Sequence, residues 1–325
     1  MTPMDEPGAL PGALIVAGPT ASGKSALAIA LAQELDGVIV NTDSMQVYRE
    51  LRVLTARPSP EDEATVPHAL YGVRPAAEAG SVAWWRDAAL AEMRAAHDAG
   101  KLPILCGGTG MYFAALTQGL ADVPVPSEAA RTEARAMLAG QGAAALHARL
   151  REHDPRTAAR LGPTDGQRLA RAWEVWLSTG RGLADWQSEN AAPAPWRFAA
   201  IRLDPPRDDL RAAIASRFTA MLQAGALEEV RALLDLRLDP ALPAMRAHGV
   251  PELSAYLRGE ITLEQAARRS ELVTGQYTKR QATWFRHHEL AKNPPTHTIH
   301  ARYACSAQLL ERELRKYLQF IRCPA

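Results

Sequence analysis

The residues from Gly18 to Ser25 read G-P-T-A-S-G-K-S and fit the phosphate-binding pattern G-x-x-x-x-G-K-[ST] at every fixed position. In such a loop, successive backbone N–H groups and the N-terminus of the next helix converge on a phosphate. Lys24 adds a positive charge, and the Ser25 hydroxyl can hold Mg²⁺. The loop therefore predicts a bound phosphate group, held by Gly18, Pro19, Thr20, Ala21, Ser22, Gly23, Lys24 and Ser25.

The segments on either side of this loop are those that its geometry requires. An apolar run at 13–17 predicts a buried strand, and the helix formers at 25–32 predict the helix that the loop opens. Further strands are expected at 38–41 and 102–106, with a helix at 83–97 between them. This alternation indicates an α/β fold, a P-loop NTPase-like three-layer core with a parallel sheet.

Two of the predicted strands end in residues that could act on a ligand. The second strand runs into D-S-M-Q-V-Y at 43–48, which places the Asp43 carboxylate beside the phosphate loop. The third runs into G-G-T-G-M-Y at 107–112, where two glycines and the Thr109 hydroxyl open a helix. Asp43 could bind a metal, act as a general base or cap a helix.

The character of the sequence changes at about residue 121. Prolines bound the next 75 residues at both ends, and no strand pattern occurs before 198–203. We expect residues 121–195 to form a helical insertion, and residues 1–120 and 196–325 to form the core. Helices are expected in the last third at 207–222, 226–234, 263–288 and 307–321.

Composition excludes several classes of protein. The 325 residues are 47% hydrophobic, yet no apolar stretch is long enough to span a bilayer and the first residues do not resemble a signal peptide. Cys106, Cys305 and Cys323 are too widely spaced for a disulfide framework or a zinc site. We interpret His297 and His300 as strand or surface residues. We expect a cytoplasmic protein with no membrane partner.

Two helical segments could bind nucleic acid. Gln167 and Arg171 share a face of one helix with Glu174. In the other, Lys279, Thr283 and Arg286 share one face, and another face carries Tyr277, Gln281 and Trp284. Cations interleaved with aromatic rings can grip a phosphate backbone and stack bases, although solvated amphipathic helices show the same pattern. Beyond residue 200, 19 Lys and Arg stand against 14 Asp and Glu.

A phosphate loop followed by a helical insertion is also typical of a small-molecule kinase with an arginine-bearing lid over ATP. However, no predicted apolar strand ends in an aspartate of Walker-B type, because the third strand ends in C-G-G at 106–108. This disfavours ATP without excluding it.

Six motifs together resemble the bacterial tRNA dimethylallyltransferase family over about residues 14–286. They are G-P-T-A-S-G-K-S, D-S-M-Q-V-Y, T-A-R-P, G-G-T-G-M-Y-F, D-G-Q-R-L-A-R-A-W-E-V and Y-T-K-R-Q-A-T-W-F-R, in this order. That family transfers a dimethylallyl group from its diphosphate to the exocyclic amine of the adenosine 3′ of the anticodon. The resemblance implies that the loop holds a prenyl diphosphate, which would explain the missing aspartate.

The resemblance also implies roles for individual residues. Asp43 matches the general base, Arg217 matches the catalytic arginine, and Thr20 would help Mg²⁺ to stabilise the diphosphate leaving group. The alternative for Arg217 is a surface arginine on an amphipathic helix. The residues implied in tRNA binding are Asp43, Ser44, Met45, Gln46, Thr109, Arg131, Gln167, Arg168, Leu169, Ala170, Arg171, Arg246 and Gly249. Thr109 could instead be a helix cap, and Arg131 an exposed helix residue.

By this resemblance the insertion would clasp the anticodon stem-loop of tRNA, and the chain is expected to act as a monomer. Some positions depart from the family pattern: Gly275 replaces an arginine, Thr278 replaces an alanine, and G-V-P-E at 249–252 stands where G-Y-K/R-E is common. A P-loop kinase, an adenylate isopentenyltransferase that modifies free AMP or ATP, and a non-catalytic tRNA-binding module remain as alternatives.

Overall fold

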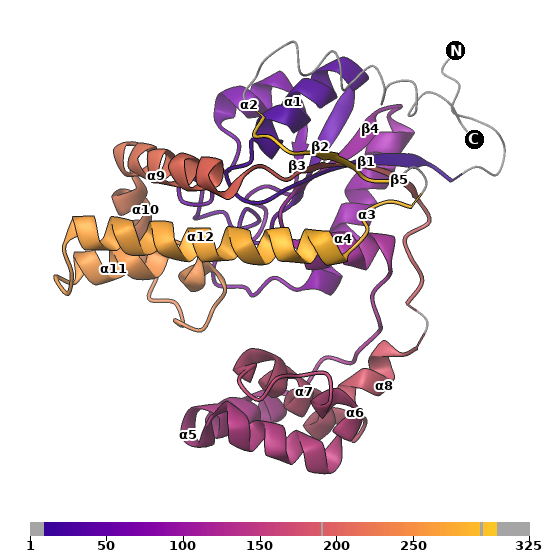
Figure 1. Cartoon of the computed structure of the whole chain (residues 1–325), viewed down its shortest axis with the longest axis vertical. Helices are drawn as coiled ribbons and strands as arrows, with labels where there is room; N and C mark the ends of the chain where they lie inside the picture. The colour runs from indigo at the N-terminus through magenta and orange to yellow at the C-terminus, as the bar shows by residue number, and fades with distance from the viewer. Residues whose placement is uncertain (1–9, 190, 293–294, 304–325) are drawn as a thin grey trace. The chain divides into compact units, whose positions relative to one another are not determined.

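The computed structural model describes residues 10–189, 191–292 and 295–303 (Figure 1). The helix predicted at 307–321 lies outside these ranges, as do Cys305 and Cys323. The chain divides into two compact units, one made of Met1–Thr117 with Ala194–Ala325 and the other of Gln118–Pro193. Each unit has its own buried apolar core.

The larger unit is built on a six-stranded sheet in which every pair is parallel, in the order β3-β2-β4-β1-β5-β6. Parallel pairing brings the carboxyl ends of neighbouring strands to one edge of the sheet, as the registers of Ala17 and Thr42 with Gly107 show. The strands are β1 (Gly12–Ala17), β2 (Gly37–Thr42), β3 (His68–Ala69), β4 (Leu102–Gly107), β5 (Arg197–Leu203) and β6 (His297–Ile299).

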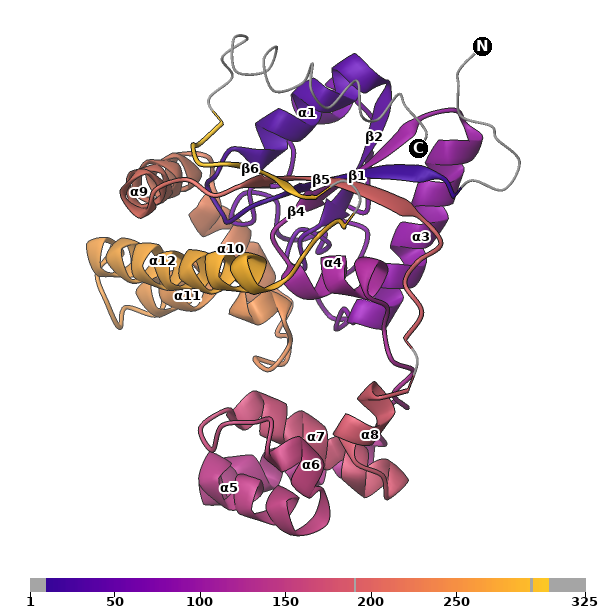
Figure 2. The same ribbon diagram turned by 45° about the vertical axis from the view of Figure 1, so that its right-hand side comes forward.

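Helices cover both faces of this sheet because its central strands are apolar on both sides (Figure 2). In β1, Ala13 and Ile15 belong to one buried cluster, whereas Leu14 and Val16 belong to the other. Helix α1 (Lys24–Leu35) packs in the second cluster, and α3 (Val82–Asp98) and α4 (Gly110–Thr117) pack in the first. The three-layer α/β core predicted from the sequence is confirmed.

The C-terminal helices extend the first layer. They are α9 (Arg207–Gln223), α10 (Ala226–Asp235), η1 (Ala244–Arg246), α11 (Val250–Leu257) and α12 (Leu263–His287). Helix α12 packs against α9, α11 and α4, so a segment late in the chain lies beside the helix that follows β4 (Figure 1). Its first turn is closed by a capping box between Thr262 and Gln265, which satisfies otherwise free backbone N–H groups.

The smaller unit is entirely helical over its described residues. Leu146, Leu150, Leu169 and Trp173 form the centre of its core. The long first helix is interrupted at Gly142, whose φ of 80° lies in the left-handed region that favours glycine. Its helices are α5 (Glu128–His153), α6 (Pro155–Ala158), α7 (Gly166–Thr179) and α8 (Leu183–Gln187).

Some elements differ from those that the sequence pattern predicts. The two-residue β3 and the short helix α2 (Pro60–Thr65) were not predicted, because neither is long enough to show a hydrophobic period. His297 begins β6, which confirms the strand interpretation of this histidine. Among the described residues, no helix combines the length and apolarity needed to cross a membrane.

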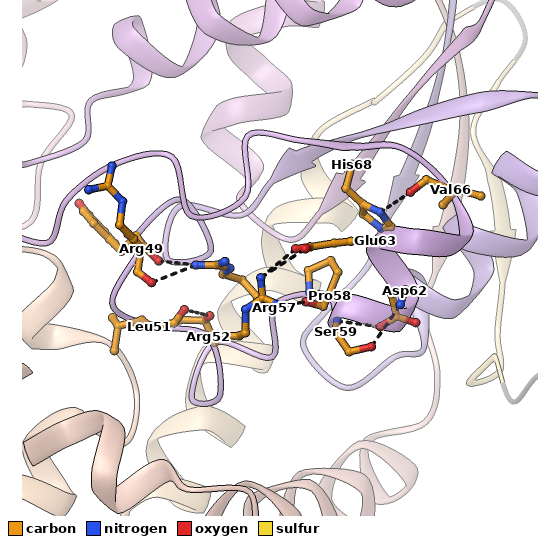
Figure 3. Close-up of polar contacts among 12 residues, drawn as sticks. Arg49, Leu51, Arg52, Arg57, Pro58, Ser59, Asp62, Glu63, Val66 and His68 are labelled. Atoms are coloured by element: carbon orange, nitrogen blue, oxygen red, sulfur yellow. Dashed lines mark hydrogen bonds and ion pairs between the residues drawn. The ribbon is translucent and has the colours of Figure 1, made fainter. Parts of the chain in front are cut away.

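The T-A-R-P motif lies in a loop that polar contacts hold in place. The Arg57 guanidinium donates to the carbonyl oxygens of Tyr48 (3.2 Å) and Arg49 (3.1 Å), so it ties the motif back to the segment that follows β2 (Figure 3). Arg52 donates to Glu63 and to the carbonyl of Pro58 beside it (Figure 3). Both arginines therefore hold the backbone of this loop in place.

A carboxylate from α10 completes the anchoring of this loop. The Glu229 side chain accepts three successive backbone N–H groups, those of Arg52 (2.7 Å), Val53 (2.7 Å) and Leu54 (2.9 Å). Hydrogen bonds to a charged acceptor are the stronger kind, and no strand or helix partner would otherwise satisfy these groups. One side chain thus joins the C-terminal helices to the loop that follows Asp43.

We predict that Glu229→Ala lowers the free energy of unfolding by about 3 kcal/mol, because three N–H groups lose a charged acceptor. Urea denaturation would measure the change. The matched control is Glu228→Ala, since Glu228 is exposed and contacts only Arg231 within its own helix. A difference of less than about 0.5 kcal/mol between the two variants would contradict the anchoring role.

Candidate functional site

The phosphate loop connects β1 to α1 and has the backbone shape that its pattern predicts. Ala21 and Gly23 have positive φ values of 67° and 90°, and the Ser22 N–H donates to the carbonyl of Pro19 (3.2 Å). The Ser22 hydroxyl is buried and has no hydrogen-bond partner in the described part of the chain. Positive φ at a non-glycine residue costs free energy, and such strain is typical of ligand-binding loops.

Lys24, Asp43 and Arg217 lie close enough together to perturb one another. Burial lowers the pKa of the Lys24 ammonium, the nearby Asp43 carboxylate opposes this, and Arg217 adds to it. Burial likewise lowers the pKa of Arg217, again opposed by Asp43. Two cations from α1 and α9 thus face one carboxylate, which leaves the site positively charged and suited to an anion such as a diphosphate.

Both cations are available to a ligand. The Lys24 ammonium makes one long hydrogen bond, to the Pro19 carbonyl at 3.4 Å. Among the described residues, Arg217 has no ion pair or hydrogen bond, although it is partly buried on the inner side of α9. A partly buried guanidinium without a partner is unfavourable in the absence of a ligand. The sequence alone did not place Arg217 beside the loop, because nearly 200 residues separate them.

Asp43 is held in a defined position by its neighbours. Its N–H donates to Asn41 Oδ1 (2.8 Å), and Asn41 Nδ2 donates to the carbonyls of Asp43 and Leu70 (both 3.0 Å). One carboxylate oxygen accepts the Met45 N–H at 2.9 Å. The buried Trp85 indole fixes the same strand end by donating to the Asn41 carbonyl (2.8 Å). Within the ranges that the structure describes, the second carboxylate oxygen accepts no hydrogen bond, which leaves it for a ligand or a proton.

The loop after β4 joins this site through Thr109. The Ser44 N–H donates to the Thr109 hydroxyl (3.0 Å), and the Thr109 N–H donates to the Thr42 carbonyl (3.1 Å). The hydroxyl therefore links the ends of β2 and β4 instead of capping its own helix. Its position beside Asp43 is compatible with the predicted contact to RNA, which stays a prediction.

Tyr277 and His248 line the same region; the sequence pattern had marked Tyr277 on a face that could meet RNA, whereas His248 was not predicted. Burial and the Asp43 charge raise the pKa of Tyr277 to about 12, and side-chain hydrogen bonding to Thr109 opposes the rise. The two rings meet edge to face at 4.8 Å. Burial lowers the pKa of His248, which favours the neutral imidazole. Tyr277 belongs to the Y-T-K-R-Q motif, whereas no sequence signal marks His248.

The two faces of α12 differ in what they contact. Lys279, Thr283 and Arg286 are exposed, as expected for a surface that could meet RNA. The Gln281 side chain is buried, and a Cβ atom added to Gly110 would lie 2.2 Å from the Trp284 ring. On the face that carries Tyr277, Gln281 and Trp284, Gln281 is therefore closed off from RNA, and Trp284 packs on Gly110 at the start of α4.

Some of the residues of the smaller unit that were predicted to contact RNA are exposed, and others are buried. Gln167 and Arg168 are exposed on α7, and Arg171 pairs with Glu174 at 3.5 Å. Leu169 and Ala170 are buried in the core of this unit, so their side chains do not reach a partner, contrary to the expectation for them. The remaining cation, Arg131, pairs with Glu128 at 3.0 Å on α5.

Other predicted contacts lie in the larger unit. Arg246 is exposed in η1. Gly249 is buried, and the Leu54 side chain leaves little space for a Cβ atom at this position. The Gln46 amide donates to the carbonyls of Thr55 and Ala56, both at 2.9 Å, so it already has a structural role in the T-A-R-P loop. Met45 and Ser44 are partly buried next to Asp43.

Cys106, the cysteine within the described residues, is not suited to act as a nucleophile. Cys106 precedes the last residue of β4 and its thiol lies 3.7 Å from the Lys24 carbonyl oxygen; burial raises the pKa of this thiol to about 11, and Lys24 opposes the rise. A thiol with this pKa is protonated at neutral pH and is a poor nucleophile.

The sequence of the chain matches two related family models. The family described as IPP transferase matches residues 46–288, and the one described as isopentenyl transferase matches residues 11–71. Curated relatives named tRNA dimethylallyltransferase are 60% identical to the chain. The protein from Granulibacter bethesdensis aligns over 95% of this chain and 98% of its own length, and that from Gluconacetobacter diazotrophicus over 95% and 93%.

Solved structures agree with these matches. A tRNA isopentenylpyrophosphate transferase from Bacillus halodurans superposes with a TM-score of 0.68 at 30% identity, over 96% of both chains. A eukaryotic dimethylallyltransferase acting on tRNA gives a TM-score of 0.71 at 25% identity, over 84% of this chain and 69% of that one. Since sequence and fold agree over nearly its whole length, the chain belongs to the IPP transferase family, together with the bacterial tRNA dimethylallyltransferases.

Proposed function

We propose that this protein transfers a dimethylallyl group from dimethylallyl diphosphate to the exocyclic amine of the adenosine 3′ of the anticodon in tRNA, and releases diphosphate. The observation that carries the proposal is the meeting of Lys24, Arg217 and Asp43 at the ends of β1 and β2. Cations for a leaving diphosphate and a carboxylate for an attacking amine are the two groups that this reaction needs.

The positive side of the site would act on the leaving group. Breaking the allylic carbon–oxygen bond transfers negative charge to the diphosphate, and the loop amides, Lys24 and Arg217 would stabilise that charge as it develops. Arg217 comes from a helix remote in sequence and has no ion-pair partner among the described residues, so its charge is not neutralised before the ligand binds. Thr20 lies in the first half of the loop, where its hydroxyl would reach the same diphosphate.

Asp43 would serve as the general base. The adenine amine is a weak nucleophile because its lone pair is delocalised into the ring, so it must lose a proton as it attacks. One Asp43 oxygen is occupied by the Met45 N–H, which fixes the direction of the other.

The donors at the loop fit a divalent cation of the hard, oxygen-preferring kind. Ser25 is an exposed residue at the start of α1, and the part of the chain that the structure describes contains no cluster of three or more His, Cys, Asp and Glu. Such a cation would therefore be held mainly by the diphosphate, the Ser25 hydroxyl and water, as is usual for Mg²⁺. Mg²⁺ would neutralise charge on the leaving group.

We assign the tRNA to the exposed cations of both units. Lys279 and Arg286 on α12 and Arg168 on α7 are exposed, and arginine suits bidentate contacts to phosphate. The helical unit 118–193 would hold the anticodon stem-loop, whereas Asp43, Ser44 and Thr109 would receive the extruded adenosine. Extrusion from a loop is less costly than from a duplex.

The proposal is tested by incubating the protein and Mg²⁺ with labelled dimethylallyl diphosphate and either unmodified tRNA or AMP. We expect label in tRNA alone. Label in AMP would support the adenylate isopentenyltransferase instead, and hydrolysis of ATP without any transfer would support a kinase. Protein that binds tRNA but transfers no label would support the non-catalytic module.

We predict that Asp43→Asn lowers kcat about 10²–10⁴-fold, because asparagine can still accept the Met45 N–H but cannot take a proton. The KM for dimethylallyl diphosphate should stay within a few fold. Steady-state kinetics with tRNA would measure both, with Asp98→Asn, an exposed carboxylate at the end of α3, as the control. Full activity in Asp43→Asn would refute the assigned base.

We also predict that Arg168→Ala weakens tRNA binding and reduces the slope of log K against log salt by about one, because one phosphate contact is lost. Filter binding over a range of salt concentrations would measure it, with Arg94→Ala on α3 as an exposed control. An unchanged salt slope would place Arg168 outside the interface.

A further inference from the structure

One buried side chain of α12 connects both glycine-containing loops of the site. Gln281 is 4% exposed. Its Oε1 accepts the N–H of Thr20 in the phosphate loop at 2.9 Å, and its Nε2 donates to the carbonyl of Gly108 in the loop after β4, also at 2.9 Å. Both ends of the amide are therefore satisfied by backbone that is distant in sequence.

Two other buried polar residues of α12, Ser270 and Thr278, behave differently. The Ser270 hydroxyl donates to the Ala266 carbonyl and the Thr278 hydroxyl donates to the Gly275 carbonyl, so both bonds stay within the helix. Gln281 alone of these three reaches across to other segments. A buried amide is costly unless both of its ends are paired, and an apolar side chain would fill the same space without that cost.

The space around this amide is closely fitted. A Cβ atom added to Gly108 would lie 2.2 Å from Gln281 Nε2 and 3.2 Å from the Gly18 carbonyl oxygen. Gly108 therefore has to be a glycine for the amide to reach Thr20. Since β1 and β4 are neighbours in the sheet, the amide spans the carboxyl ends of two adjacent strands.

We propose that Gln281 is a positioning residue for diphosphate binding: it holds the Thr20 backbone, and with it the first half of the phosphate loop, in the shape that receives the diphosphate. The inference rests on the proposed function of this loop. Because Gln281 is buried, it acts through Thr20 and touches no substrate. A loop that is already ordered does not lose conformational freedom when the ligand binds, so affinity is higher.

The test compares Gln281→Met with Gln276→Met. Both replace a glutamine of α12 by a side chain of similar length, but Gln276 is exposed and has no contact with the site. The readouts are calorimetric titration with inorganic diphosphate in the presence of Mg²⁺, and KM and kcat for dimethylallyl diphosphate and tRNA. In Gln281→Met we expect about 10–100-fold weaker diphosphate binding and a higher KM for dimethylallyl diphosphate. The KM for tRNA should not change.

Gly108→Ala provides an independent route to the same effect, because its methyl group would displace the Gln281 amide without altering Gln281 itself. We expect it to weaken diphosphate binding similarly. Folded variants of either kind that bind diphosphate as the unaltered protein does would overturn the inference, as would an equal rise in the KM for tRNA. Unfolding of both variants would also contradict it, since loss of a positioning residue should leave the chain folded.

Failure of the proposed function gives a different result. If the unaltered protein binds diphosphate but transfers no dimethylallyl group to tRNA, the function is wrong, and Gln281 is still judged by the titration. If the unaltered protein does not bind diphosphate at all, both proposals fail.

Discussion

The parallel pairing of β2, β4 and β1 is the constraint on which the rest of the structure depends. Thr42 and Ala17 both lie in register with Gly107, so the chain leaves all three strands at one edge of the sheet. Asp43, the loop at Gly108 and the phosphate loop follow immediately. Thr109 ties the loop after β4 to the end of β2, and the Gln281 amide bridges that loop to the phosphate loop. The sheet therefore sets where the site residues lie, and the loops only adjust their positions.

The C-terminal helices supply what the sheet cannot. Arg217 on α9 brings the second cation, Glu229 on α10 anchors the loop after Asp43, and Gln281 on α12 spans the two glycine-containing loops. Each of these side chains acts at a point remote from it in sequence. Strain in the phosphate loop, visible in the positive φ of Ala21, is tolerated because surrounding groups hold it.

The balance of charges at the site explains how this arrangement of side chains could serve its function. Among the described residues, Asp43 is the one carboxylate whose charge acts on both Lys24 and Arg217, and burial disfavours the charged form of both cations. A diphosphate would relieve this imbalance, since it brings the negative charge that the protein lacks at this position. The exposed cations of α12 and α7 lie on solvated surfaces instead. Water hydrates their charges there, so the free-energy cost of keeping them charged is small and they remain available to a polyanion.

The sequence by itself determined the phosphate loop, the strands and helices of the core, and the position of Asp43 after a strand, because each is a local pattern of spacing or periodicity. It also marked Tyr277 and Gln281 within one motif, but it could not tell which of them was buried. Only the tertiary structure decided that Arg217 meets Lys24, that Glu229 and Gln281 bind backbone N–H groups far away in the chain, and that Leu169 and Ala170 face a core. These contacts depend on the packing of distant helices, and no local sequence preference records that packing.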